Sequence, residues 1–388
     1  MIAAGAQGPG ECISRDGSIR TALPAKGPYA DVRSAVVAAG GLAGYFTAAH
    51  AFEAERMRAI VALFALVVVV ALRPATGQAQ PVIGLITKTE TNPFFVKMRE
   101  GAQATAKAHG VRLMTGAGRN DADNAGQVTA MENMIAAGAR VILITVNDSK
   151  AIVPAIRRAR AKGILVIALD SPTDPIDATD ALYATDNYRA GTLIGQYARA
   201  ALGNRPAKIA TLDLFPGHPV GAQRHNGFLE GFGLPAPPAS SNTLGRPPQV
   251  VCMADSYGDQ TRGQTGMENC LQKNPDINVV YTINEPTAAG AYTALKAAGK
   301  EKGVVLVSVD GGCQGVRDVA AGQIAATAQQ YPIKMAELGV AAGATFIKTG
   351  KRPGGYTDTG VALIAARPVA GVESKNVATG LELCFGRK

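Results

Sequence analysis

The stretch PVIGLITKTETNPFFVKMREGA, residues 81–102, contains the pattern that recurs through most of the chain. An apolar run is followed by a polar turn, the pair Asn92-Pro93 and then a helical segment. Asn before Pro is typical of a helix start, because Asn caps the first amides and Pro is tolerated at the first helical position. The stretch therefore predicts a buried strand that leads directly into a helix.

Apolar strands alternate with amphipathic helices from residue 81 onward. One such helix, SKAIVPAIRRARAKG, has Ile152, Ile156 and Ala159 on one face and stops at Gly163. Strands rich in Val and Ile, each followed by a helix, indicate parallel sheets covered on both faces. Ten strands are expected: PVIGLITK, VRLMTGA, RVILITV, ILVIALD, ALYATD, AKIATLDLF, QVVCMAD, VVYTIN, VVLVSVD and IAATAQQ.

Ten strands exceed one ordinary doubly wound sheet, so we expect an α/β protein with two doubly wound parallel-sheet lobes. The length of 388 residues supports this division, because single cores stop growing at about 250–300 residues. Hydrophobic residues make up 47% and charged residues 18% of the chain, as in globular proteins. The net charge of +9 comes from Lys and Arg spread along the chain, so we interpret it as solvated surface and expect no nucleic-acid partner.

The segment MRAIVALFALVVVVALRPATGQA, residues 57–79, has the features of a secretory signal peptide. It begins with Met57 and Arg58, continues with an apolar stretch too short for a typical membrane span, and ends in small residues. We therefore expect translation to start at Met57 and residues 1–56 to be a mis-assigned N-terminal extension. The mature protein would begin near Gln80 and be periplasmic.

Export places four cysteines in an oxidising compartment. Cys252 ends an apolar strand and Cys270 lies on the helix that should pack beside it, so these two either form a disulfide or remain buried thiols. Cys313 either pairs with Cys384 or stays free. Their spacing does not resemble a metal site, and we expect no metal.

Polar and aromatic side chains follow several predicted strands, at the edge where parallel sheets bind ligands. They are Lys88, Asn92, Phe94, Phe95, Asp170, Ser171, Tyr257, Asn284, Asp310 and Gln330, with Arg224 on a following helix. Each polar residue alone has an ordinary explanation as a helix cap. Together they predict a site for a polyhydroxylated ligand, because amides and carboxylates bind adjacent hydroxyls and aromatic rings stack on the C–H face of a sugar.

No sequence feature favours an enzyme. The chain has no G-x-S-x-G, H-E-x-x-H or Walker motif. His218 and His225 flank Arg224 without a nucleophile or metal partner, so we interpret them as structural or as supports of the site. We predict no catalytic residues and no cofactor.

Several motifs agree in order and spacing with one known family. NPFF, ALDSPTD, GAQRHNGF, YTINEPTAAGAY, VSVDGG and AATAQQYP resemble the periplasmic ribose- and fructose-binding proteins of ABC importers, over residues 81–365. The chain is most similar to the fructose-binding members, especially in GLITKTETNPFFVKMREGA and LDLFPGHPVGAQRHNGF. The resemblance implies a type I periplasmic binding protein fold, whose two lobes are joined by a three-strand hinge.

The resemblance also implies roles for the site residues. Phe94, Phe95 and Tyr257 would be the stacking walls. The hydrogen-bond partners of the sugar would be Asn92, Asp170, Arg224, Asn284, Asp310 and Gln330. By the same resemblance, the hinge crossings lie near Thr185-Asp186, Gln330-Tyr331 and Asp358-Thr359. Lobe one would then be residues 81–185 plus 331–358, and lobe two residues 186–330 plus 359–388.

Two departures from the ribose binders change the expected ligand. An arginine follows the strand-end aspartate in those proteins, whereas this chain has Ser171, and Lys88 stands where a small hydroxyl residue is usual. The resemblance therefore favours fructose, with ribose and mannose as alternatives. It implies a monomer that delivers its sugar to an inner-membrane ABC permease and that could also dock on a chemoreceptor. The alternative function is a sugar-responsive transcriptional regulator, which shares the two-lobed core but carries an N-terminal helix-turn-helix.

Overall fold

The computed structural model describes residues 57, 63 and 80–386. The predicted extension, residues 1–56, lies outside the described residues, and so does the predicted signal peptide, residues 57–79, apart from two positions. Within the described part of the chain, no helix combines the length and the hydropathy needed to cross a lipid bilayer.

Sheet A is the first of two six-stranded sheets, and all its neighbouring strands are parallel. Its spatial order is β11 (Gly355–Asp358), β5 (Ala181–Ala184), β4 (Leu165–Leu169), β3 (Val141–Ile144), β1 (Val82–Thr87) and β2 (Arg112–Ala117). We call this sheet and the helices that cover it lobe one.

Sheet B is built in the same way, with one antiparallel strand at its edge. Its spatial order is β12 (Ala362–Ala365), β10 (Ala326–Gln329), β9 (Val305–Asp310), β8 (Val279–Thr282), β6 (Ile209–Asp213) and β7 (Val250–Asp255). Sheet B and its helices are lobe two. The predicted fold class, two doubly wound parallel-sheet lobes, is confirmed.

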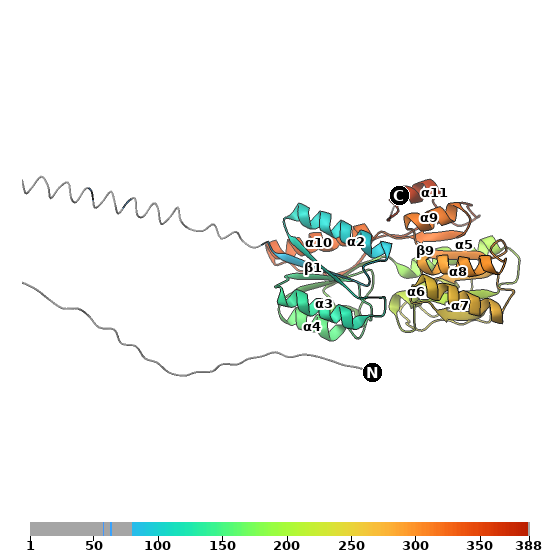
Figure 1. Cartoon of the computed structure of the whole chain (residues 1–388), viewed down its shortest axis with the longest axis horizontal. Coiled ribbons are helices and arrows are strands. Elements are labelled where there is room, and N and C mark those ends of the chain that lie inside the picture. Colours follow the sequence, from blue (N-terminus) through green and yellow to red (C-terminus); the bar gives the residue numbers. More distant parts are fainter. Residues whose placement is uncertain (1–56, 58–62, 64–79, 387–388) are drawn as a thin grey trace, which may run out of the picture. The chain divides into compact units, whose positions relative to one another are not determined.

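Helices cover both faces of sheet A (Figure 1). They are α2 (Pro93–His109) and α10 (Pro332–Thr349) on one face, α3 (Asn124–Ala136) and α4 (Val153–Ala161) on the other, and a short 3-10 helix, η1 (Ile176–Ala178). The side chains of strand β1 pack on both faces of the sheet. Ile83 and Leu85 belong to the core shared with α2 and α10, and Val82 and Ile86 belong to the core shared with α3 and α4. Burial on both faces is why this strand reads as a continuous apolar run.

Lobe two has the same layered construction. Its helices are α5 (Asn187–Leu202) and α6 (Pro219–Phe232) on one face, α7 (Gln260–Lys273), α8 (Glu285–Ala297) and α9 (Cys313–Ala320) on the other, and α11 (Val377–Leu383) against α9. On β6, Ile209 faces the first core, and Ala210 and Leu212 face the second.

The chain passes between the sheets three times, after β5, after β10 and after β11. The hinge positions expected from the sequence lie in these three connections. The predicted boundaries of the two lobes, residues 81–185 plus 331–358 and residues 186–330 plus 359–388, stay a prediction.

The sequence-based strand count was wrong, because it omitted β11 and β12. Each has four residues, and every residue of β11 is exposed, so it shows no apolar alternation. These strands form because the chain returns beside β5 and β10 and completes their hydrogen bonding, which local sequence does not indicate.

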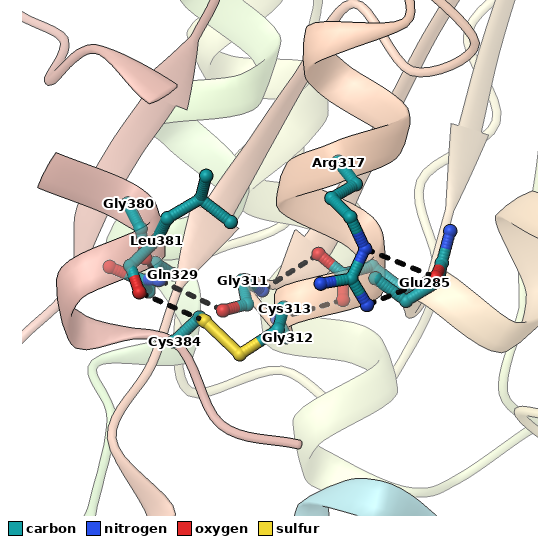
Figure 2. Close-up of a disulfide and its surroundings, with 10 residues drawn as sticks. Glu285, Gly311, Gly312, Cys313, Arg317, Gln329, Gly380, Leu381 and Cys384 are labelled. Atoms are coloured by element: carbon teal, nitrogen blue, oxygen red, sulfur yellow. Dashed lines mark hydrogen bonds between the residues drawn. A yellow bond between two sulfur atoms is a disulfide. The ribbon is translucent and has the colours of Figure 1, made fainter. Parts of the chain in front are cut away.

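The described residues contain two disulfides, which settles both questions left open for the cysteines. Cys252 on β7 pairs with Cys270 on α7, with a Cα–Cα distance of 5.6 Å. Cys313 at the start of α9 pairs with Cys384, just after α11, with a Cα–Cα distance of 4.9 Å (Figure 2). The alternatives of buried thiols at Cys252 and Cys270 and of a free Cys313 are wrong.

Candidate functional site

The carboxyl ends of strands from both sheets meet at one cavity of about 40 Å³. Nine of the eleven predicted site residues line it: Lys88, Asn92, Phe94, Phe95, Asp170, Arg224, Asn284, Asp310 and Gln330. Asp121, Leu214, Val220 and Ile283 complete the lining. Residues about 240 positions apart in sequence are brought together because both lobes present the same kind of sheet edge.

A larger groove of about 1300 Å³ adjoins this cavity, since Asn92, Asp121 and Asp310 line both. We place the candidate site in the small cavity and not in the groove. The reason is chemical: the cavity is where buried amide, carboxylate, guanidinium and ammonium groups converge with aromatic rings. Its volume of about 40 Å³ is smaller than a monosaccharide, so a sugar would fit only after the lobes move apart.

Asp310 is joined to Gln330 by a hydrogen bond and to Arg224 by an ion pair, in a polar network on the lobe-two side of the cavity. The Gln330 side-chain amide donates to Asp310 Oδ1 over 2.7 Å, and Arg224 Nη1 lies 3.7 Å from the same oxygen. Arg224 is itself fixed, because its Nε donates to Asn187 Oδ1 over 2.7 Å and its Nη1 donates to the Ile283 carbonyl over 2.9 Å. Burial raises the pKa of Asp310, and Arg224 and Gln330 oppose that rise. The network is therefore preorganised around a buried carboxylate.

Asn92 and Asn284 serve both as helix caps and as cavity residues. Asn92 Oδ1 accepts from the Phe94 amide at the start of α2, and Asn284 Oδ1 accepts from the Thr287 amide at the start of α8. Asn284 also donates through Nδ2 to the Gly258 carbonyl. The ordinary and the functional explanations of these residues thus hold at the same time.

Phe94 and Phe95 form the aromatic wall of the cavity, from the first turn of α2. Their rings meet edge to face, with centroids 5.2 Å apart. Both are at most 5% exposed and belong to the core between sheet A and its helices. The rings are therefore held in place by packing from behind.

Two predicted residues do not line the cavity. Ser171 is buried beside it and donates from Oγ to Asp170 Oδ2 over 2.8 Å. Tyr257 lines the larger groove, where its ring stacks on Phe215 and the Arg262 guanidinium lies 4.3 Å from its centroid. Ser171 acts on the site only through Asp170, and Tyr257 lies at its approach.

Asp121 is a cavity residue that sequence reasoning missed. Its Oδ1 is buried and, among the described residues, has no hydrogen-bond partner. The pKa of Asp121 is raised to about 6, mainly by burial and in smaller part by the Asp170 and Asp259 carboxylates, while the Lys88 charge opposes the rise. Asp121 follows β2, so applying the strand-end rule to that strand as well would have found it.

Two histidines behave as supports. His218 Nε2 lies 3.4 Å from Lys88 Nζ across the two lobes, and burial with the Lys88 charge lowers the pKa of His218, so its neutral ring accepts from the ammonium group. His225 is fully buried between Asp213 Oδ1 and the Gly245 carbonyl, each 2.8 Å away. Among the described residues, no group of acidic, His and Cys side chains is arranged to hold a metal ion.

Comparison with known proteins shows the family to which the chain is similar. The family model for a periplasmic binding protein domain matches residues 83–352. The ribose import binding protein RbsB of Haemophilus influenzae is 32% identical over 284 residues, which cover 73% of this chain and 91% of that protein. The D-allose-binding periplasmic protein of Escherichia coli is 27% identical, over 69% of this chain and 85% of that one.

Solved structures of the same kind of protein have a similar fold. A periplasmic solute binding protein of an ABC transporter from Actinobacillus succinogenes, with bound D-allose, has a TM-score of 0.65 and 27% identity, over 74% of this chain and 98% of that one. The relatives named here are binding proteins and not enzymes, and so is this chain, as the sequence predicts. The chain belongs to the periplasmic binding protein family.

Proposed function

We propose that this periplasmic binding protein is the solute-binding component of an ABC sugar importer, and that it closes around one monosaccharide. The observation that carries the proposal is the cavity lined by carboxylates and amides from both lobes and by aromatic rings from lobe one. A sugar offers what this cavity complements: hydroxyls that both donate and accept, and apolar C–H faces. The names of the ribose- and allose-binding relatives support the same ligand class.

Fructose is the first candidate for the sugar. The cation that ribose binders are expected to carry after the strand-end aspartate is replaced by Ser171, which bonds to Asp170. A cation at Lys88 and a carboxyl at Asp121 stand instead on the β1 and β2 side of the cavity. This altered charge pattern favours a hydroxyl arrangement other than that of ribose.

Transport would follow from a hinge movement of the two lobes. A sugar that touches both lobes stabilises the closed form by its differential affinity. Closure excludes water, so an epimer that leaves a buried partner unpaired is penalised. We propose that the closed form, in the periplasm, delivers the sugar to an inner-membrane permease. A monomeric state and docking on a chemoreceptor stay predictions, and no observation here favours the transcriptional regulator.

Calorimetric titration of the mature chain with fructose, ribose, allose, mannose, xylose and galactose tests the proposal. We expect saturable one-to-one binding of one sugar, with weaker binding of its epimers. Absence of heat and of thermal stabilisation with all six would contradict the monosaccharide assignment.

Asp310→Ala and Asn92→Ala should each weaken binding at least about tenfold, because losing a hydrogen bond to a buried charged or polar partner costs about 1.5 kcal/mol or more. Asn376→Ala is the matched control, since Asn376 caps α11 in the way that Asn92 caps α2 but lies outside the cavity. Affinities of both site variants within threefold of wild type would place the ligand elsewhere.

A further inference from the structure

The segment after α11 connects the two lobes beside the candidate site. Cys384 is bonded to Cys313 of lobe two (Figure 2). The next residue, Phe385, is 4% exposed and packs into the core of lobe one. Its ring meets Phe94 edge to face, with centroids 5.4 Å apart and an interplanar angle of 83°.

Lobe two holds the backbone of this segment firmly. The Cys313 amide donates to the Phe385 carbonyl over 2.7 Å, and Gly312 pairs with Phe385 in a parallel bridge. The preceding Gly311 and Gly312 amides donate to the half-buried Glu285 carboxyl group over 2.8 and 2.9 Å. These bonds tie Phe385 to the loop that begins at the cavity residue Asp310.

A second set of bonds holds the same loop from the side of α11. The Gln329 side-chain amide donates to both the Gly311 and the Gly380 carbonyls, over 2.8 and 2.9 Å (Figure 2). The Thr327 hydroxyl donates to Glu285 Oε1 over 2.8 Å. The loop after β9, the start of α9 and the end of α11 therefore form one rigid unit.

Phe94 is in this way held between two edge contacts, Phe95 at 90° and Phe385 at 83°. Phe95 belongs to the same lobe, whereas Phe385 is anchored to the other. The contact between Phe94 and Phe385 therefore depends on how the lobes meet. It fixes the plane of a cavity-lining ring when they close and is lost when they separate.

We propose that Phe385 is a positioning residue for the aromatic wall of the sugar site, and that the Cys313–Cys384 disulfide holds it in place. This inference rests on the proposed function. Without Phe385, Phe94 has a void behind one edge, and the closed form loses an aromatic contact between the lobes. Both effects weaken sugar binding through the closed form.

The test compares sugar affinity, sugar dissociation rate and thermal stability in four variants. Phe385→Ala removes the ring, Phe385→Leu keeps an apolar side chain, and the double variant Cys313→Ser with Cys384→Ser removes the anchor. The matched control is Cys252→Ser with Cys270→Ser, because it also removes one disulfide of lobe two but one that joins β7 to α7 and does not hold Phe385.

We expect Phe385→Ala and the Cys313/Cys384 variant to bind the wild-type sugar at least about fivefold more weakly, in line with the energy of an aromatic pair. The loss should appear mainly as faster dissociation, because the contact belongs to the closed form. Phe385→Leu should recover part of the affinity. The Cys252/Cys270 control should melt at a lower temperature yet bind within about twofold of wild type.

Lower melting temperatures with unchanged affinity and dissociation rate in Phe385→Ala, Phe385→Leu and the Cys313/Cys384 variant would show that Phe385 only supports the core, and would overturn the inference. If Phe385→Ala does not fold, the leucine and cysteine variants decide. Wild-type protein that binds none of the six sugars would instead refute the proposed function, and the inference with it.

Discussion

Asp170, Tyr257 and Asp310 are the non-glycine residues with positive φ among residues 80–386, at 63°, 55° and 139°. Asp170 and Asp310 line the cavity and Tyr257 lines its approach. Backbone strain of this kind costs about 1–3 kcal/mol per residue and persists only where the surroundings impose it. At Asp310 the Gln330 and Arg224 contacts and the rigid loop after β9 supply that constraint.

Asp121→Asn should change stability and binding in opposite directions at pH 7.5. The folded-state pKa of Asp121 is raised to about 6, above its unfolded value, so the ionised carboxyl disfavours the folded state above pH 6. Removing the charge should therefore raise the melting temperature at pH 7.5, by an amount that shrinks as the pH falls from 6 toward 4. If the carboxylate accepts from a sugar hydroxyl, the same variant should bind more weakly at pH 7.5.

The pH profile of sugar affinity provides the check. Wild-type affinity should decrease as the pH falls through about 6, because Asp121 and Asp310, each with a pKa raised to about 6, gain protons there and lose acceptor oxygens. The Asp121→Asn profile should be flatter over pH 5–7.5 and should keep only the part that belongs to Asp310. A variant that is more stable but binds with wild-type affinity at every pH would remove Asp121 from the site.

At the scale of elements, Arg224 is positioned by the close packing of α5 on α6. A Cβ on Gly191 would lie 2.1 Å from the Arg224 carbonyl, and one on Gly227 would lie 2.1 Å from the Tyr188 carbonyl. Gly195 and Gly231 face the opposite helix at 2.2 and 2.1 Å in the same way. Glycines on both helices thus let the two backbones touch, which sets where the Arg224 side chain emerges.

Gly191→Ala should force α5 and α6 apart and lower the free energy of unfolding by about 1–3 kcal/mol or more, the usual cost of overpacking. Sugar affinity should fall as well, because Arg224 moves with its helix. Urea unfolding and calorimetry measure the two effects. Gly303→Ala is the control, since its added Cβ would meet no atom closer than 3.9 Å, and equal behaviour of the two variants would contradict the packing argument.

The sequence could predict the elements that are marked by a pattern in their own residues. Buried strands such as β1 and capped helices such as α2 carry their own pattern, so both were expected within a few residues. Strand β11 and residue Phe385 were not expected, because β11 pairs with a strand about 174 residues away and Phe385 contacts a ring of the other lobe. Strand β12 was not expected because it has only four residues and pairs antiparallel at the edge of an otherwise parallel sheet. Asp121 had a local signal, its place after β2, that was not used.

For the whole molecule, the contacts between the lobes explain why a ligand should control closure. Outside the hinge, the side-chain hydrogen bonds that join the lobes in the described chain are Lys88 with His218, at 3.4 Å, and Asn242 with Asp174, at 3.5 Å. Both are at the long limit of such bonds and are therefore weak. The contact between the Phe94 and Phe385 rings adds an apolar interaction between the lobes. A sugar that bonds to both lobes would contribute more than these contacts together.

Addition of the sugar should therefore make the mature protein more compact in small-angle X-ray scattering and raise its melting temperature by mass action. Asp310→Ala provides the comparison, because it removes a lobe-two partner of the sugar. It also removes the acceptor of the hinge residue Gln330, but it keeps both partners of the hinge hydrogen bonds Thr185–Gln330 and Asp186–Asp358. With this variant, the same sugar concentration should change neither quantity. Compaction of the variant to the wild-type extent would mean that closure does not require the buried carboxylate, and that the lobes are drawn together by contacts outside the cavity.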